Sequence, residues 1–99
     1  MNELYSIHEL KTVLAPVFSR HGVHNAILFG SYAKGSATAQ SDVDLLVNSG
    51  LRGMAFYGLL EDVASSLRVP VDLIDTTQIE PDSEIDREIR KSGVTIYGQ

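Results

Sequence analysis

The 99-residue sequence predicts one small α/β domain, residues 1–99, in which helices pack on a short sheet. Segments with helical spacing of apolar residues alternate along the chain with short apolar runs of strand length. Apolar residues make up 43% of the chain, which is enough for one core. No internal repeat, low-complexity tract or linker divides the sequence.

The first predicted element is a helix that begins after Ser6 and ends near Gly22. Ser6 and Glu9 have the spacing of a capping box. Pro16 falls inside the helix and is expected to kink it. The residues with helical apolar spacing are Ile7, Leu10, Val13, Leu14, Val17 and Phe18.

The next part of the chain predicts two strands joined by a short connection. Residues 23–29 form the first apolar run and residues 42–47 the second. Between them, residues 32–35 predict a helical turn and residues 36–41 a polar loop.

The second half of the chain predicts a loop at 48–53 and a helix at 54–67. Pro70 precedes a third strand at 71–75, and residues 76–81 are expected to be irregular. The helix places four apolar residues on one side: Leu59, Leu60, Val63 and Leu67.

A last helix and a terminal strand complete the pattern. Asp82 or Ser83 is expected to cap the helix, in which Asp86 and Arg90 have the spacing of an ion pair. The strand covers residues 94–97.

Composition and charge limit the possible partners. The net charge is −5, from thirteen acidic and eight basic residues, and no basic stripe is visible, so direct binding of nucleic acid is disfavoured. No apolar run is long enough to cross a bilayer, and no cleavable signal pattern opens the chain. With no cysteine for disulfides or thiolate metal sites, a cytoplasmic protein is expected.

The most informative motif is Gly30-Ser31, ten further residues, and then Asp42-Val43-Asp44. Alternation along a strand places Asp42 and Asp44 on one face, where two carboxylates can hold hard divalent cations. The small polar turn at Gly30 and Ser31 can bring backbone N–H groups and a hydroxyl close to a phosphate. Together they indicate magnesium-dependent chemistry on a nucleoside triphosphate.

Triphosphate chemistry with two metal ions roughly 3.5–4 Å apart usually needs a third carboxylate. Asp72, second in the third predicted strand, is the favoured candidate, and Asp75 on the opposite face is its rival. Lys34 is the only Lys or Arg between residues 21 and 51. It either reaches the triphosphate as a point charge or is an ordinary solvated lysine.

These motifs resemble those of the polymerase β-like nucleotidyltransferase superfamily. The segments Phe29-Gly30-Ser31-Tyr32-Ala33-Lys34-Gly35 and Ser41-Asp42-Val43-Asp44-Leu45, with the later Val71-Asp72-Leu73, carry the resemblance. They are typical of its minimal nucleotidyltransferase (MNT) group, the antitoxin half of HEPN–MNT toxin–antitoxin pairs. The ending at residues 92–98 is also similar, so the resemblance spans essentially the whole chain.

The resemblance implies an α/β (α+β) fold, a small mixed sheet flanked by helices, with three catalytic aspartates converging at one edge. Asp42 and Asp44 would bind both Mg²⁺ ions, and Asp72 would complete the ion on the nucleophile side. Gly30 and Ser31 would hold the triphosphate of ATP.

The implied reaction is transfer of AMP from ATP to a hydroxyl, with release of pyrophosphate. The acceptor would be a tyrosine of a partner HEPN toxin, a helical ribonuclease that the transfer silences, and a homo- or hetero-oligomer is expected.

Two alternatives remain open from the sequence. A non-catalytic antitoxin would block its toxin by contact, with the last helix and Phe56 as the interface. A transferase acting on a small molecule, such as an aminoglycoside, would need a further domain to hold the acceptor. Nothing in this sequence resembles such a domain.

Overall fold

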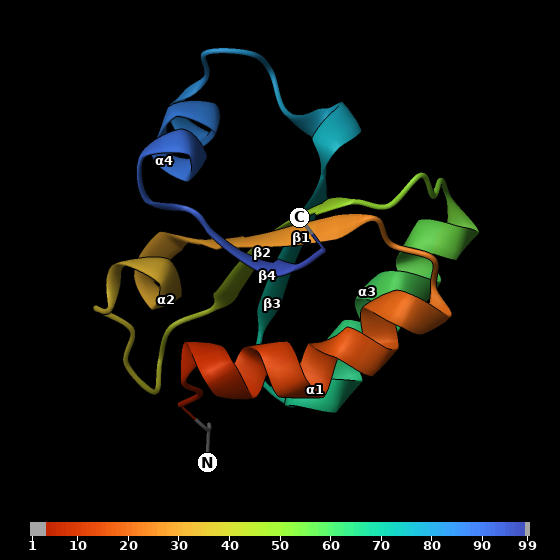
Figure 1. Ribbon diagram of the computed structural model, residues 1–99, viewed down its shortest axis with the longest axis horizontal. Coiled ribbons are helices and arrows are strands. Elements are labelled where there is room, and N and C mark those ends of the chain that lie inside the picture. Colours follow the sequence, from red (N-terminus) through yellow and green to blue (C-terminus); the bar gives the residue numbers. More distant parts are fainter. Residues whose placement is uncertain (1–3, 99) are drawn as a thin grey trace.

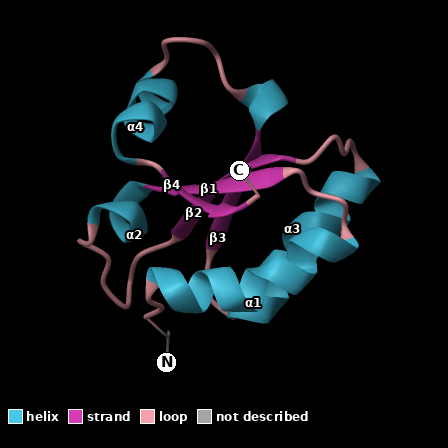
Figure 2. Cartoon of the chain, viewed as in Figure 1, coloured by secondary structure: helices cyan, strands magenta, loops and turns pink. Residues whose placement is uncertain are grey.

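The computed structural model describes residues 4–98, which form a four-stranded sheet with helices on both faces (Figure 1). Figure 2 shows the predicted alternation of helices and strands. The elements in chain order are α1 (Ile7–Arg20), β1 (Asn25–Phe29), α2 (Gly30–Lys34), β2 (Val43–Asn48), α3 (Met54–Leu67), β3 (Val71–Asp75), the 3₁₀ turn η1 (Thr76–Gln78), α4 (Glu84–Ser92) and β4 (Val94–Tyr97). Three of them, α3, β3 and β4, have the predicted bounds.

The sheet is mixed, as the resemblance implied. Its strand order is β3-β2-β1-β4. Strand β1 runs antiparallel to both β2 and β4, whereas β2 and β3 are parallel. The parallel pair is possible because α3 forms the crossover connection that parallel neighbours need.

The two faces of the sheet bury different amounts of apolar surface. Helices α1 and α3 cover one face and form the main core with it (Figure 1). The other face carries a smaller cluster, in which Ile89 of α4 packs on Phe29 and Leu46. Asp44 alternates with Val43 and Leu45 of the main core, so it lies on the α4 face. The predicted site therefore lies on the face of the sheet that α4 covers.

Several predicted boundaries differ from the structure by one or two residues. Strand β1 begins at Asn25 and not at residue 23, and β2 begins at Val43, so Asp42 lies just before the strand. The capping box at Ser6 is confirmed, and Pro16 lies within α1, which continues to Arg20. None of the helices in the described part of the chain is long and apolar enough to span a membrane.

The connection to α4 is more ordered than the sequence indicated. Residues 76–81, expected to be irregular, include the turn η1. Ser83, one of the two candidates, is the residue that caps α4. The predicted ion pair between Asp86 and Arg90 is confirmed.

Candidate functional site

Two of the three predicted site aspartates are neighbours across the parallel strand pair. The register of β2 and β3 places Asp44 directly beside Asp72. Adjacent strands lie about 4.8 Å apart, so the two side chains project side by side from the α4 face. Asp42 precedes β2 and is exposed at the same end of the sheet.

The turn at Gly30 lies directly against Asp44. The residue before it, Phe29, is the antiparallel partner of Asp44 across β1 and β2. Gly30 has a φ of +73°, and a Cβ there would lie 2.2 Å from Oδ2 of Asp44. Only glycine therefore allows both the backbone conformation and the approach of the carboxylate. Ser31 follows in the first turn of α2, beside this contact.

The electrostatics of Asp44 are unusual for a carboxyl group. Burial, followed by the negative charges of Asp72, Asp42 and Glu88, raises the pKa of Asp44 from 3.8 to about 6. The position of Glu88 beside Asp44 could not be predicted from the sequence, because the mixed charges of its helix resemble a solvated surface. Only the packing of α4 over this face of the sheet reveals its proximity to Asp44.

Lys34, the predicted cation, is paired within the structure. Its Nζ lies 3.4 Å from Oε2 of Glu88, which joins the end of α2 to α4. Lys34 is thus next to the acidic site, and its charge is shared with a carboxylate of α4.

Asp75, the rival third carboxylate, has a different role. It is 4% exposed, and its side chain accepts hydrogen bonds from the backbone N–H of Ser49 (3.1 Å) and of Thr77 (3.0 Å). The hydroxyls of Ser49 (2.5 Å) and Thr77 (2.7 Å) donate to it as well. Burial acts to raise the pKa of Asp75, but these hydrogen bonds outweigh it and hold the pKa below its usual value. Asp75 therefore ties the end of β2 to η1, which leaves Asp72 as the candidate near Asp44.

The donor set at this end of the sheet suits a hard divalent cation. Within residues 4–98, no three His, Asp or Glu side chains already form a ligand cluster. Burial and the negative charges of Asp72, Asp42 and Glu88 nevertheless raise the pKa of Asp44. Carboxylate oxygens that repel one another are the ligands that Mg²⁺ prefers, and a bound cation would remove the repulsion.

Comparison with known proteins identifies the family. The model of the family described as "Polymerase beta, Nucleotidyltransferase" matches residues 12–99. A protein of Methanocaldococcus jannaschii named as a protein adenylyltransferase is 33% identical over 79 residues, which cover 77% of this chain and 84% of that protein. The chain belongs to the polymerase β nucleotidyltransferase family, and it is a nucleotidyltransferase.

Solved structures share the fold. The chain is similar to one in a toxin–antitoxin crystal structure with AMP-PNP, with a TM-score of 0.76, 24% identity, and coverage of 90% of this chain and 73% of that one. A complex of a tri-AMPylated Shewanella oneidensis HEPN toxin with its MNT antitoxin matches with a TM-score of 0.70, 21% identity, and coverage of 94% and 73%. A minimal nucleotidyltransferase structure matches with a TM-score of 0.72, 24% identity, and coverage of 94% and 98%. The family model confirms the predicted resemblance to the polymerase β-like nucleotidyltransferase superfamily, and these structures confirm the predicted fold.

Proposed function

We propose that the chain transfers AMP from ATP to a hydroxyl of a HEPN-type partner protein and so acts as an antitoxin. The observation that carries the proposal is the pairing of Asp44 with Asp72 beside the turn at Gly30. The family membership supports the reaction class, and the adenylyltransferase name of the M. jannaschii relative supports AMP as the group transferred.

In this proposal, Asp42, Asp44 and Asp72 hold two Mg²⁺ ions. Bound there, the metal would activate the attacking hydroxyl and stabilise the leaving oxygen. The turn at Gly30 starts α2 beside Asp44, and the hydroxyl of Ser31 would donate to a phosphate oxygen.

The acceptor approaches from the edge of the sheet. Strand β3 is an edge strand, and Asp72 is exposed on it. The acceptor oxygen forms a bond to the α-phosphorus while the bond from that phosphorus to pyrophosphate breaks. The hydroxyl proton leaves to a carboxylate oxygen or to water. Asp72, on the open side of the aspartate pair, orients the hydroxyl for this attack.

The proposed acceptor is a tyrosine of the HEPN partner, and the reaction takes place in the cytoplasm. The similarity to MNT chains that are bound to HEPN toxins supports this kind of partner. The net charge of −5 favours a protein acceptor over a nucleic acid.

The test is incubation of the protein with ATP, Mg²⁺ and the HEPN protein encoded beside it, followed by the intact mass of both chains. We expect the partner to gain one or more adenylyl groups, and Asp42→Asn to abolish the gain while its circular dichroism stays unchanged. Transfer by Asp42→Asn at the parental rate would overturn the assignment of the site. A point change of the acceptor tyrosine to phenylalanine is the matched control.

A surface away from Asp42, Asp44 and Asp72 supports a second candidate function, in which the chain neutralises a toxin by contact alone. Met54 and Tyr57 are 84% and 54% exposed. Tyr57 lines a cavity of about 540 Å³ together with Phe56 and Leu60. Exposed apolar groups beside such a cavity are typical of protein interfaces. If Asp42→Asn still neutralises the toxin in cells without any adduct, this second function holds.

A further inference from the structure

A cavity between α2 and α4 lies beside the acidic site. Its volume is about 490 Å³, and its lining residues are Lys34, Arg87, Glu88, Lys91 and Ser92. Three of the eight Lys and Arg residues of this acidic chain therefore line one cavity. Such a concentration of positive charge creates a local field that favours an anion.

The packing of α4 places the cavity next to the aspartates. Glu88, one of its lining residues, precedes Ile89, which packs on Phe29, the strand partner of Asp44. Lys34, another, is the last residue of α2, the helix that begins at Gly30. Arg87 and Lys91 are four residues apart and so lie one above the other on α4.

We propose that this cavity receives the β- and γ-phosphates of the nucleoside triphosphate, with Arg87 and Lys91 supplying the positive charge. The inference rests on the proposed function and adds two residues of α4 to the nucleotide site. In this proposal, α4 is the element that distinguishes a triphosphate from a monophosphate. AMP lacks the β- and γ-phosphates that would enter the cavity.

The proposed site is strongly acidic. A triphosphate that approaches the site meets the carboxylates of Asp42, Asp44, Asp72 and Glu88. The charge of Lys34 is already shared with Glu88 at 3.4 Å. The Mg²⁺ ions of the proposed site would offset part of this repulsion, and Arg87 and Lys91 would add positive charge for the β- and γ-phosphates.

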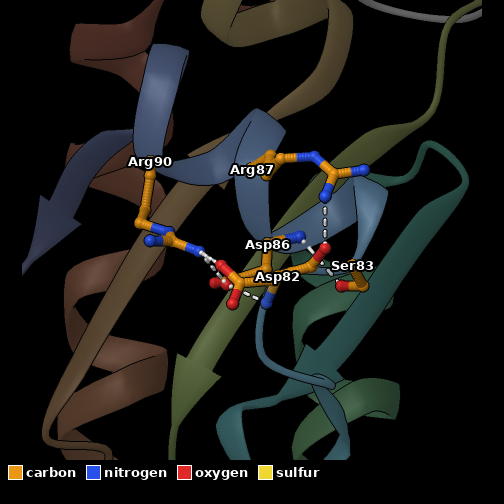
Figure 3. Close-up of polar contacts among 5 residues, drawn as sticks. All are labelled: Asp82, Ser83, Asp86, Arg87 and Arg90. Atoms are coloured by element: carbon orange, nitrogen blue, oxygen red, sulfur yellow. Dashed lines mark hydrogen bonds and ion pairs between the residues drawn. The ribbon is translucent and has the colours of Figure 1, made fainter.

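The other basic residue of the same helix provides a contrast. Arg90 donates hydrogen bonds to the carboxylates of Asp82 and Asp86 at the start of α4 (Figure 3). Arg87 donates to the backbone carbonyl of Asp82 and to no carboxylate, although its charge helps to lower the pKa of Asp86 (Figure 3). Across residues 4–98, neither Arg87 nor Lys91 has an acidic side chain at ion-pair distance.

The experiment is calorimetric titration of the full chain with ATP, inorganic tripolyphosphate and AMP, each with Mg²⁺. The variants are Arg87→Gln, Lys91→Gln and the double change. Arg90→Gln is the matched control on the same helix, and Lys11→Gln on α1 controls for net charge. Gln is a strong helix former, so α4 should persist. Lys91→Gln removes no hydrogen bond that ties α4 to its own start, so it keeps the test independent of folding.

We expect each single variant to bind ATP and tripolyphosphate about 10-fold more weakly, the effect of one charge-assisted contact. Binding of AMP should stay within about twofold, and both controls should behave like the parent. Equal losses in Arg90→Gln or Lys11→Gln, or equal losses for AMP, would overturn the inference. So would unchanged affinity for ATP in the double variant, and in that case the proposed function would stand.

Failure of the proposed function has a different signature. If the parent binds ATP in a manner that depends on Arg87 and Lys91 but modifies no partner, the cavity assignment holds and the acceptor is wrong. If the parent binds no nucleotide, both proposals fall.

Discussion

Asp44 and Asp75 lie in adjacent strands of one sheet and differ in almost every physical respect. Asp44, at the start of β2, is surrounded by Asp42, Asp72 and Glu88, and its pKa is raised to about 6. Asp75, at the end of β3, accepts hydrogen bonds from Ser49 and Thr77, and its pKa is lowered. The fold satisfies one carboxylate and leaves the other repelled by its neighbours. This difference assigns Asp75 a structural role and supports the metal-binding role proposed for Asp44.

The same difference makes the start of β2 a favourable place for a cation. A buried carboxylate with donors around it has no need of a cation. A carboxylate with only other carboxylates around it lowers its free energy when a cation binds. The repulsion at Asp44 is therefore part of what the site would use to bind metal and nucleotide.

The largest expected effect is on activity. Asp44→Asn should lower the rate of AMP transfer about 1000-fold, since loss of a metal ligand removes several kcal/mol of transition-state stabilisation. The rate is measured by intact mass of the partner over time. Asp75→Asn, assayed well below its melting temperature, is the control and should keep a rate near the parental one. Similar losses in both variants would remove the distinction between the two aspartates.

The next effect is on stability. Asp75→Ala leaves the hydroxyl and the N–H of Ser49 buried without their acceptor, which should cost about 3 kcal/mol. Urea denaturation followed by circular dichroism measures the change. Glu80→Ala, an exposed carboxylate in the connection that follows η1, is the control and should leave the midpoint unchanged. A loss no larger than that of the control would mean that Asp75 does not hold β2 to η1.

A substitution at Gly30 would test how closely this residue packs against Asp44. Gly30→Ala should destabilise the protein through its positive φ and through contact with Oδ2 of Asp44. In an Asp44→Ala background that oxygen is absent, and the nearest remaining atom of residue 44 would be the Cβ at 3.4 Å. A double-mutant cycle should therefore give a coupling of about 1–2 kcal/mol, because the cost of the φ angle cancels. A coupling near zero would show that the carboxylate moves away freely.

The sequence predicts the strands that carry this site better than it predicts the charges around Asp44. The strand bounds around Asp72 and the alternation that separates it from Asp75 follow from local pattern, since strand periodicity is a backbone property. The register that pairs Asp44 with Asp72 depends on the crossover through α3, which no local pattern specifies. The proximity of Glu88 to Asp44 could not be predicted, because charged residues on a short helix resemble a solvated surface until the packing partner of the helix is known.

The smallest expected effect is a gain in stability that depends on pH. The pKa of Asp44 is about 6 in the folded protein, against an ordinary value of 3.8 for the unfolded chain, so the folded state binds the proton more tightly. Above pH 6 both states are ionised, and the charged carboxylate destabilises the fold; below about pH 4 both are protonated and the penalty vanishes. Asp44→Asn should thus stabilise the protein at pH 8 by about 1 kcal/mol, after the shift is discounted for solvent screening of a partly exposed group. Thermal unfolding at pH 8 and at pH 4 measures the gain.

Two features make that gain specific to the aspartate cluster. It should shrink as the pH falls from about 6 toward 4, because the parent protein then neutralises Asp44 by protonation and resembles the asparagine variant. It should also shrink when Mg²⁺ and a nucleotide are added, since ligands that bind only the folded parent stabilise it by mass action. If Asp44→Asn stabilises the protein equally at pH 8 and pH 4, the cause is packing or local backbone propensity and not charge. A gain that Mg²⁺ leaves untouched would mean that the repulsion at Asp44 is not coupled to metal binding, and the contrast with Asp75 would then be one of stability alone.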